Sequence, residues 1–236
     1  TLLTKTQEWR QSWPLPFIAM LGIAGTAALA YTNGIFMIEM TRDLGWTKTE
    51  FSTAMMEQMV VSLLIAPFAA RALDRYGPRR VLLVGVLPFA AGLSVLGLVS
   101  GPVWHWWALS GLLGFAAAGV IPAAWMHGVV QSFNAARGMA IAVCLAGIGL
   151  ATVGWPLIAA YWVETLGWRL TFPAIAALWA AIVLPLVYFF YKPEMAQTTS
   201  QSGELPPIWP SVRTSTFGIL IVAGGLFASV QFGLIV

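Results

Sequence analysis

The sequence has 236 residues, of which 59% are hydrophobic and 9% are charged, and its formal net charge is +3 at pH 7. Soluble domains carry about 25% charged residues, so this composition excludes a soluble globular fold, and its hydrophobicity excludes a disordered chain. The single cysteine, Cys144, excludes a secreted disulfide scaffold. Twelve basic residues scattered along the chain do not form a patch for nucleic acid. The composition therefore predicts an integral membrane protein.

Seven segments are apolar enough to cross a bilayer, which takes about 20 residues. In chain order they are residues 14–38, 47–72, 78–100, 103–130, 136–162, 170–191 and 217–236. The second begins with Thr47-Lys48-Thr49-Glu50, a helix-capping box, and the third begins with Pro78, a favoured first-turn residue. Short turns join the first six segments, which predicts antiparallel neighbours.

Residues 192–216 are rich in Pro, Ser, Thr and Gln, a composition typical of a flexible linker. They divide the chain into a six-span unit (residues 1–191), the linker, and a single span (residues 217–236). The chain does not begin with Met, and its seventh span reaches the last residue. We therefore expect it to be a fragment of a longer protein.

Basic residues favour cytoplasmic loops, and this bias predicts the orientation of the chain. Nine of the twelve Lys and Arg residues lie on the side of the N-terminus and the linker, and three lie opposite: Arg42, Lys48 and Arg169. We expect a cytoplasmic N-terminus and a location in the plasma (cytoplasmic) membrane. Six tryptophans at the predicted outer boundaries are typical of an aromatic belt: Trp46, Trp104, Trp106, Trp107, Trp162 and Trp168.

The turn between the second and third spans, residues 70–80, reads ARALDRYGPRR. It resembles the signature loop of the major facilitator superfamily, G-x-x-x-D-R-x-G-x-R-R, at every fixed position except the first, where Ala70 replaces Gly. The start of the sixth span, GWR with Phe172, resembles that of many family members. The fifth span, from RGMA at 137–140 to GWP at 154–156, is similar to that of the monocarboxylate-porter and oxalate/formate-exchanger branches.

The resemblance implies an all-α membrane protein with a six-helix bundle of two three-helix repeats, followed by a cytoplasmic loop and the first helix of a second bundle. It implies a secondary active transporter that moves a small solute by alternating access, with ion coupling. The branch similarity points to an organic anion such as a monocarboxylate.

The resemblance also implies a gating role for the signature loop. Asp74 would pair with loop arginines and with helix ends of the other half when the cytoplasmic side is shut, and Gly77 would permit the tight turn. The cations of this latch are Arg75, Arg79 and Arg80. In the alternative interpretation, the arginines only fix topology and contact anionic lipid.

Ionisable groups inside a span are costly and therefore mark functional sites. Glu57 is the only acidic residue well inside a predicted span, and Thr53 and Gln58 extend its polar stripe. Asn33 in the first span is predicted to lie at a similar depth. We interpret this group as a substrate or proton site, with a helix-locking glutamate as the alternative. Arg137 is expected to anchor the fifth span, with substrate binding as the alternative.

An anionic substrate needs a cation, yet no Lys or Arg stands deep in a predicted span. A proton-coupled exporter of hydrophobic or cationic compounds is therefore the second hypothesis, because Glu57 suits it. For His127, near the cytoplasmic end of the fourth span, we expect either a proton relay or a residue at the membrane interface. A membrane enzyme or receptor is a third class, but no nucleophile–base pair, P-loop or retinal-binding lysine is present. The pattern predicts no cofactor or metal site; the expected partners are a small solute, lipid and protons.

Overall fold

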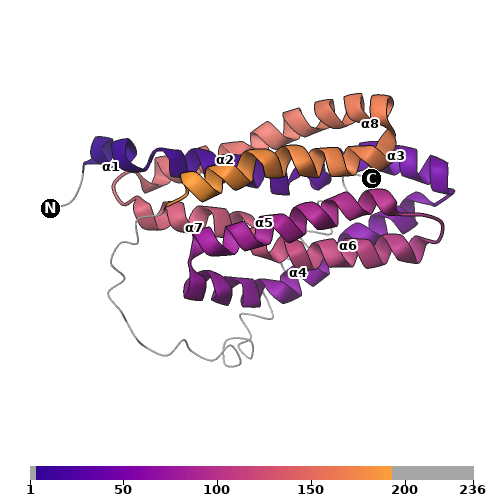
Figure 1. The fold of residues 1–236 in the computed structure, drawn as a ribbon, viewed down its shortest axis with the longest axis horizontal. Helices are drawn as coiled ribbons and strands as arrows, with labels where there is room; N and C mark the ends of the chain where they lie inside the picture. Colours follow the sequence, from indigo (N-terminus) through magenta and orange to yellow (C-terminus); the bar gives the residue numbers. More distant parts are fainter. Residues whose placement is uncertain (1–3, 193–236) are drawn as a thin grey trace. The chain divides into compact units, whose positions relative to one another are not determined.

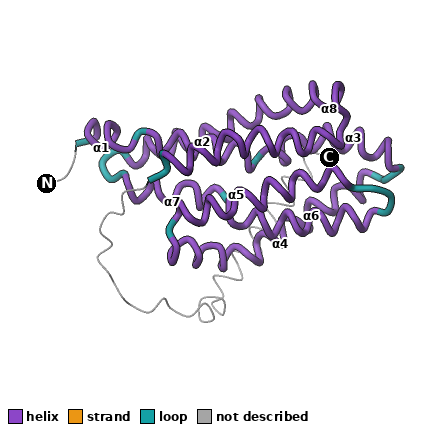
Figure 2. The backbone as a smooth tube through the Cα atoms, viewed as in Figure 1, coloured by secondary structure: helices purple, strands orange, loops and turns teal. Residues whose placement is uncertain are grey.

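In the computed structural model, residues 4–192 are described, and this part of the chain is built from helices and short turns (Figure 1; Figure 2). The predicted linker beyond Lys192 and the predicted span 217–236 lie outside the described residues. The elements are α1 (Lys5–Ser12), α2 (Pro14–Thr26), α3 (Ala28–Leu44), α4 (Lys48–Tyr76), α5 (Pro78–Val95), the 3-10 helix η1 (Leu96–Leu98), α6 (Val103–Ala117), the 3-10 helix η2 (Ala118–Val120), α7 (Pro122–Ser132) and α8 (Arg137–Phe189).

Six helical segments have the length and apolarity of membrane spans. Four of them are Pro14–Leu44, Lys48–Tyr76, Pro78–Leu98 and Val103–Ser132. The fifth and sixth are the two arms of the 53-residue α8, which is interrupted at Gly167, where φ is 77° and ψ is 160°. Figure 1 shows α8 doubling back at this point. The described residues therefore contain six helical segments in the order of the first six predicted spans.

The ends of the bundle are made of tight turns in which glycine adopts a positive φ, a conformation that costs glycine little. One end, which we name the Gly101 end, contains the turns at Gly45, Gly101 and Gly167. The Trp46 indole there donates to the carbonyl of Gly101 at 3.0 Å. The other end, the Gly77 end, contains the turn at Gly77 and the loop 133–136.

The centre of the bundle is held by α2, which packs against both arms of α8, while α4 packs against α6 (Figure 1). Small residues of α2 admit large rings: a Cβ on Gly25 would lie 1.7 Å from the Trp179 ring, and one on Gly22 would lie 2.4 Å from the Trp125 ring. Gly147 of α8 similarly faces the backbone of Met20. Close approach at small residues maximises van der Waals contact between membrane helices.

The fourth span is a broken helix. Ile121 has an extended backbone with a ψ of 155°, and Pro122 then begins α7. Pro122 favours this break, because proline lacks an N–H and its ring clashes with the preceding turn. Pro67 and Pro156, in contrast, lie inside α4 and the first arm of α8 without ending either helix.

The predicted tryptophan belt is wrong for half of its members. Trp46, Trp106 and Trp168 are 8%, 0% and 6% exposed. Their indole N–H groups bond to other parts of the bundle: Trp106, for example, donates to the carbonyl of Phe51 at 3.1 Å. These tryptophans join helices to one another because a buried indole N–H needs an acceptor.

Candidate functional site

The signature loop makes the tight turn that its glycine predicts. Gly77 has a φ of 79°, and its N–H donates to the carbonyl of Leu73 at 2.9 Å, which ends α4. Pro78 then takes the first position of α5. A side chain at position 77 would strain this backbone, so glycine is required by the conformation rather than by space.

Two arginines of the signature loop contact residues of their own bundle. Arg79 donates to the carbonyl of Tyr188 at the end of α8, and its guanidinium carbon lies 5.8 Å from the centre of the Tyr188 ring. Arg75 lies over the ring of Tyr76 at 5.4 Å. Asp74 is exposed and forms no ion pair within residues 4–192. Arg79 therefore stabilises a helix end of its own bundle, where a cation is favourable.

The candidate proton site lies between α4 and α6. Glu57 is half-buried, and a Cβ on Gly111 of α6 would lie 3.1 Å from its Oε1. The two helices come closest one turn further along, where a Cβ on Gly114 would lie 2.5 Å from the carbonyl oxygen of Gln58. Thr53 is exposed and donates to a carbonyl of its own helix. The absence of a side chain at Gly111 leaves room for the Glu57 carboxylate, and its absence at Gly114 admits the backbone of Gln58.

Asn33 does not join this site through a hydrogen bond. Its Oδ1 is buried and finds no donor among the described residues, and the same is true of the Ser110 hydroxyl, which is 1% exposed. Asn33 and Glu57, the two predicted parts of the site, are thus not joined by a hydrogen bond. The first span also extends to Leu44, so Glu39 lies inside it together with Asn33; the sequence had suggested that Glu57 was the only such acidic residue.

Arg137 is engaged with the loop that precedes it. Its Nε donates to the carbonyl of Phe133 and its Nη2 donates to Oδ1 of Asn134, both at 3.0 Å. These bonds agree with the expected anchoring of the fifth span.

The sequence reasoning missed Glu8, which lies on the N-terminal helix α1. Its buried carboxylate, 5% exposed, accepts from the backbone N–H groups of Asn134, Ala135 and Ala136 at 3.0–3.3 Å. These bonds, the one from Ala135 foremost, hold the pKa of Glu8 below its ordinary value, although burial opposes them. The N-terminus of α8 explains this contact: α8 begins after Ala136 without any side-chain cap, so it needs an acceptor from elsewhere.

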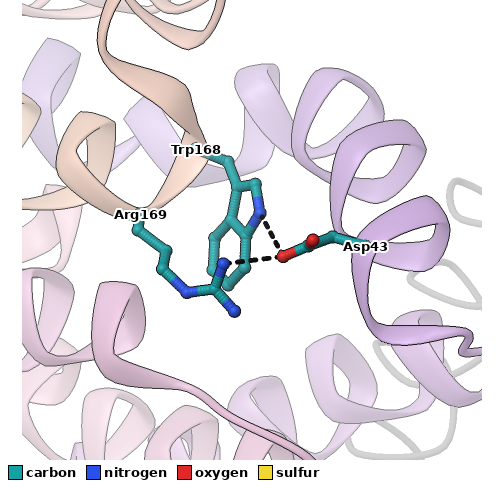
Figure 3. Close-up of polar contacts among 3 residues, drawn as sticks. All are labelled: Asp43, Trp168 and Arg169. Carbon is teal, nitrogen blue, oxygen red and sulfur yellow. Dashed lines mark hydrogen bonds and ion pairs between the residues drawn. The ribbon is translucent and has the colours of Figure 1, made fainter.

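A second missed cluster lies at the Gly101 end (Figure 3). One carboxylate oxygen of Asp43 accepts from Nη1 of Arg169 at 2.6 Å and from the Trp168 indole at 3.2 Å. The guanidinium also lies over the Trp168 ring, 4.2 Å from its centre. This cluster joins the end of the first span to the start of the sixth. The sequence marked the start of the sixth span through its GWR, but it did not mark the pairing with Asp43.

The arrangement of six membrane-spanning helices with a signature loop between the second and third agrees with a sequence comparison. The family model of the Major Facilitator Superfamily matches residues 12–236. The chain belongs to this family. It is therefore an integral, multi-pass helical membrane protein of a family of secondary transporters, which bind small-molecule substrates and are not enzymes. No curated protein matches the chain. The match identifies the superfamily but not the monocarboxylate-porter or oxalate/formate branch.

Proposed function

We propose that the protein moves a small organic anion, such as a monocarboxylate, across the plasma membrane by alternating access, with protons as the coupling ion. The observation that carries the proton coupling is Glu57, a half-buried carboxylate within the span Lys48–Tyr76 that lies against Gly111. Burying a charge in a membrane is costly, so a carboxylate that persists there is suited to binding and releasing protons.

The proposal includes an orientation and a latch. The basic bias places the Gly77 end and the N-terminus in the cytoplasm. Asp74, Arg75 and Arg80 are exposed at that end, so they are free to contact the second bundle, which residues 217–236 would begin. Arg79 contributes indirectly by holding the end of α8.

Uptake into proteoliposomes tests the proposal. Full-length protein is reconstituted, and labelled lactate, pyruvate and oxalate are supplied with and without a pH gradient. We expect accumulation driven by an inward proton gradient, and we expect Glu57→Gln to abolish the response to the gradient. Glu164→Gln, the same change at an exposed position, is the matched control and should behave as the wild type. Uptake that ignores the gradient in wild-type protein would contradict proton coupling.

A second candidate is proton-coupled export of hydrophobic or cationic compounds. The side chains next to Glu57 favour it, because Met56 and Met59 are 51% and 46% exposed and offer a flexible apolar surface. The same vesicles distinguish the two functions: proton-driven movement of an organic cation, with no carboxylate uptake, would replace the first proposal with the second.

A further inference from the structure

A histidine–glutamine pair lies on α7, within the membrane span Val103–Ser132. His127 and Gln131 are one helical turn apart, and the Nε2 atoms of the two side chains are 2.8 Å from each other. His127 is five residues from the end of the span at Ser132, or about 7.5 Å along the helix axis at 1.5 Å per residue. A polar pair at this depth is costly in lipid.

The pair lies on the side of α7 that does not hold the bundle together. The buried side of α7 consists of Ala124, Trp125, Gly128 and Val129. These residues lie on the side that packs against α2, α5 and α8. His127 and Gln131 are both partly exposed, and Ala123, one turn before His127, is exposed. The hydrogen bond between the pair joins two residues of one helix, so it does not lock helices to one another.

The pair can accommodate two protonation states. As placed, the Gln131 amide donates to Nε2 of His127, which suits a neutral imidazole with its proton on Nδ1. If the amide turns over, its oxygen accepts from a protonated Nε2 instead, so the imidazolium is also hydrogen-bonded. A half-turn of the amide exchanges its donor and its acceptor, so Gln131 can serve either state of the imidazole.

We propose that His127 and Gln131 bind the carboxylate of the transported anion on the Gly77 side of the transport path, and that His127 takes up a proton when the anion binds. The inference rests on the proposed function and names a site for its substrate. The span Val103–Ser132 contains no Lys or Arg, so His127 is the group that can supply a positive charge in this half of the span. The proton adds from water to the Nε2 lone pair, and it leaves when the carboxylate leaves.

The surrounding charges fit this coupling. α2, which packs against α7, has no titratable side chain, and η2 has none either. α5 carries Arg79 and Arg80 in its first turn, and Arg79 is bound to Tyr188. α8 carries several titratable groups: Arg137, Cys144, Tyr161, Glu164, Arg169 and Tyr188. Of these, Arg137 is bound to the loop 133–136. A carboxylate that reaches the pair would attract the proton onto His127.

Nuclear magnetic resonance of the histidine rings tests the site directly. Full-length protein in lipid nanodiscs is labelled with isotope-enriched histidine, and the ring signals are assigned by their loss in His127→Asn and His105→Asn. Sodium lactate is then added, with sodium chloride at equal ionic strength as the control. We expect a saturable shift of the His127 signals and none of the His105 signals. Gln131→Leu should weaken lactate binding about tenfold, the effect of one hydrogen bond to a charged group.

Lactate uptake by the same variants completes the test. His127→Asn should raise KM about tenfold or more, whereas the matched His105→Asn should leave KM and kcat unchanged. Uptake of lactate without a shift of the His127 signals would overturn this inference alone. Absence of both uptake and shift, for lactate and pyruvate, would overturn the inference together with the proposed anion substrate. A saturable shift without uptake would support the site and count against the proposed transport.

Discussion

The two ends of the bundle use their charged residues in different ways. At the Gly101 end, Asp43 and Arg169 neutralise each other, and indoles join neighbouring segments. At the Gly77 end, charged side chains bond to the backbone at the two ends of α8. Glu8 accepts from the N–H groups that precede α8, and Arg79 donates to a carbonyl near the C-terminus of α8. The difference shows which charges stabilise the bundle itself and which remain available for other contacts.

Glu8→Gln should have the largest effect on stability and should loosen the Gly77 end. A glutamine keeps one acceptor but turns an NH₂ group toward backbone donors, so buried N–H groups lose their partners. We expect a clear fall in the apparent Tm of the protein in detergent. Glu164→Gln, on an exposed residue, is the matched control and should leave the Tm unchanged; equal Tm values for the two variants would contradict a tether at Glu8.

The same tether has a defined dependence on pH. The folded-state pKa of Glu8 lies below its ordinary value of about 4.3. The stability that the Glu8 carboxylate contributes is therefore fully present above this ordinary value, and it is lost as pH falls through the lower, folded-state pKa. The Tm difference between wild type and Glu8→Gln should therefore be constant near neutrality and shrink below about pH 4. A difference that persisted unchanged in acid would show that the carboxylate charge is not responsible.

Tyr191→Phe should have a smaller effect at the same end. The Tyr191 hydroxyl donates to the carbonyl of Trp125 at 2.7 Å, and the side chain is fully buried. Removing one such hydrogen bond costs about 1 kcal/mol. Denaturation of wild type and variant measures the loss, with Tyr188→Phe, at an exposed ring, as the matched control.

Asp43→Asn should destabilise the Gly101 end less than Glu8→Gln destabilises the Gly77 end. The Asp43 and Arg169 side chains are 46% and 48% exposed, so water and salt screen their attraction. Double-mutant analysis with Arg169→Gln measures the coupling, which should decrease as salt is raised. A coupling energy larger than the destabilisation by Glu8→Gln, and independent of salt, would show that charges stabilise the Gly101 end more than the Gly77 end.

Asp74→Asn should leave stability unchanged and still lower transport. Asp74 is exposed and has no ion-pair partner within residues 4–192, so the bundle does not depend on its charge. If the carboxylate instead acts against the second bundle, membrane insertion and Tm should match the wild type while uptake falls several-fold. Uptake at the wild-type rate would contradict a latch at this residue.

Local patterns in the sequence predicted much of the fold. The capping box at Thr47 forms, with Glu50 Oε2 accepting from the Thr47 N–H at 2.8 Å. Pro78 begins a helix, and Gly77 makes the turn of the signature loop. Each of these features depends on residues within one or two turns of chain, so spacing alone reveals it.

The candidate site was predicted less well. Glu57 was singled out because an acidic residue in an apolar run stands out, but its packing against Gly111 of the fourth span was not predicted. Glu8 was missed because its hydrogen-bond donors are backbone N–H groups more than 120 residues away. Backbone groups are the same in every residue, so no sequence pattern marks them as partners.

The sequence by itself determined that the chain lies in a membrane, how many times its first part crosses, and which superfamily signature it carries. These properties follow from hydrophobicity and local residue spacing, which determine whether a segment can lie in the bilayer. Only the tertiary structure decided that Arg79 caps α8, that three predicted belt tryptophans are buried, and that Asp43 meets Arg169. Such contacts depend on how helices rotate and pack against one another, and in a membrane that packing is set by detailed shape and hydrogen bonding rather than by hydrophobicity.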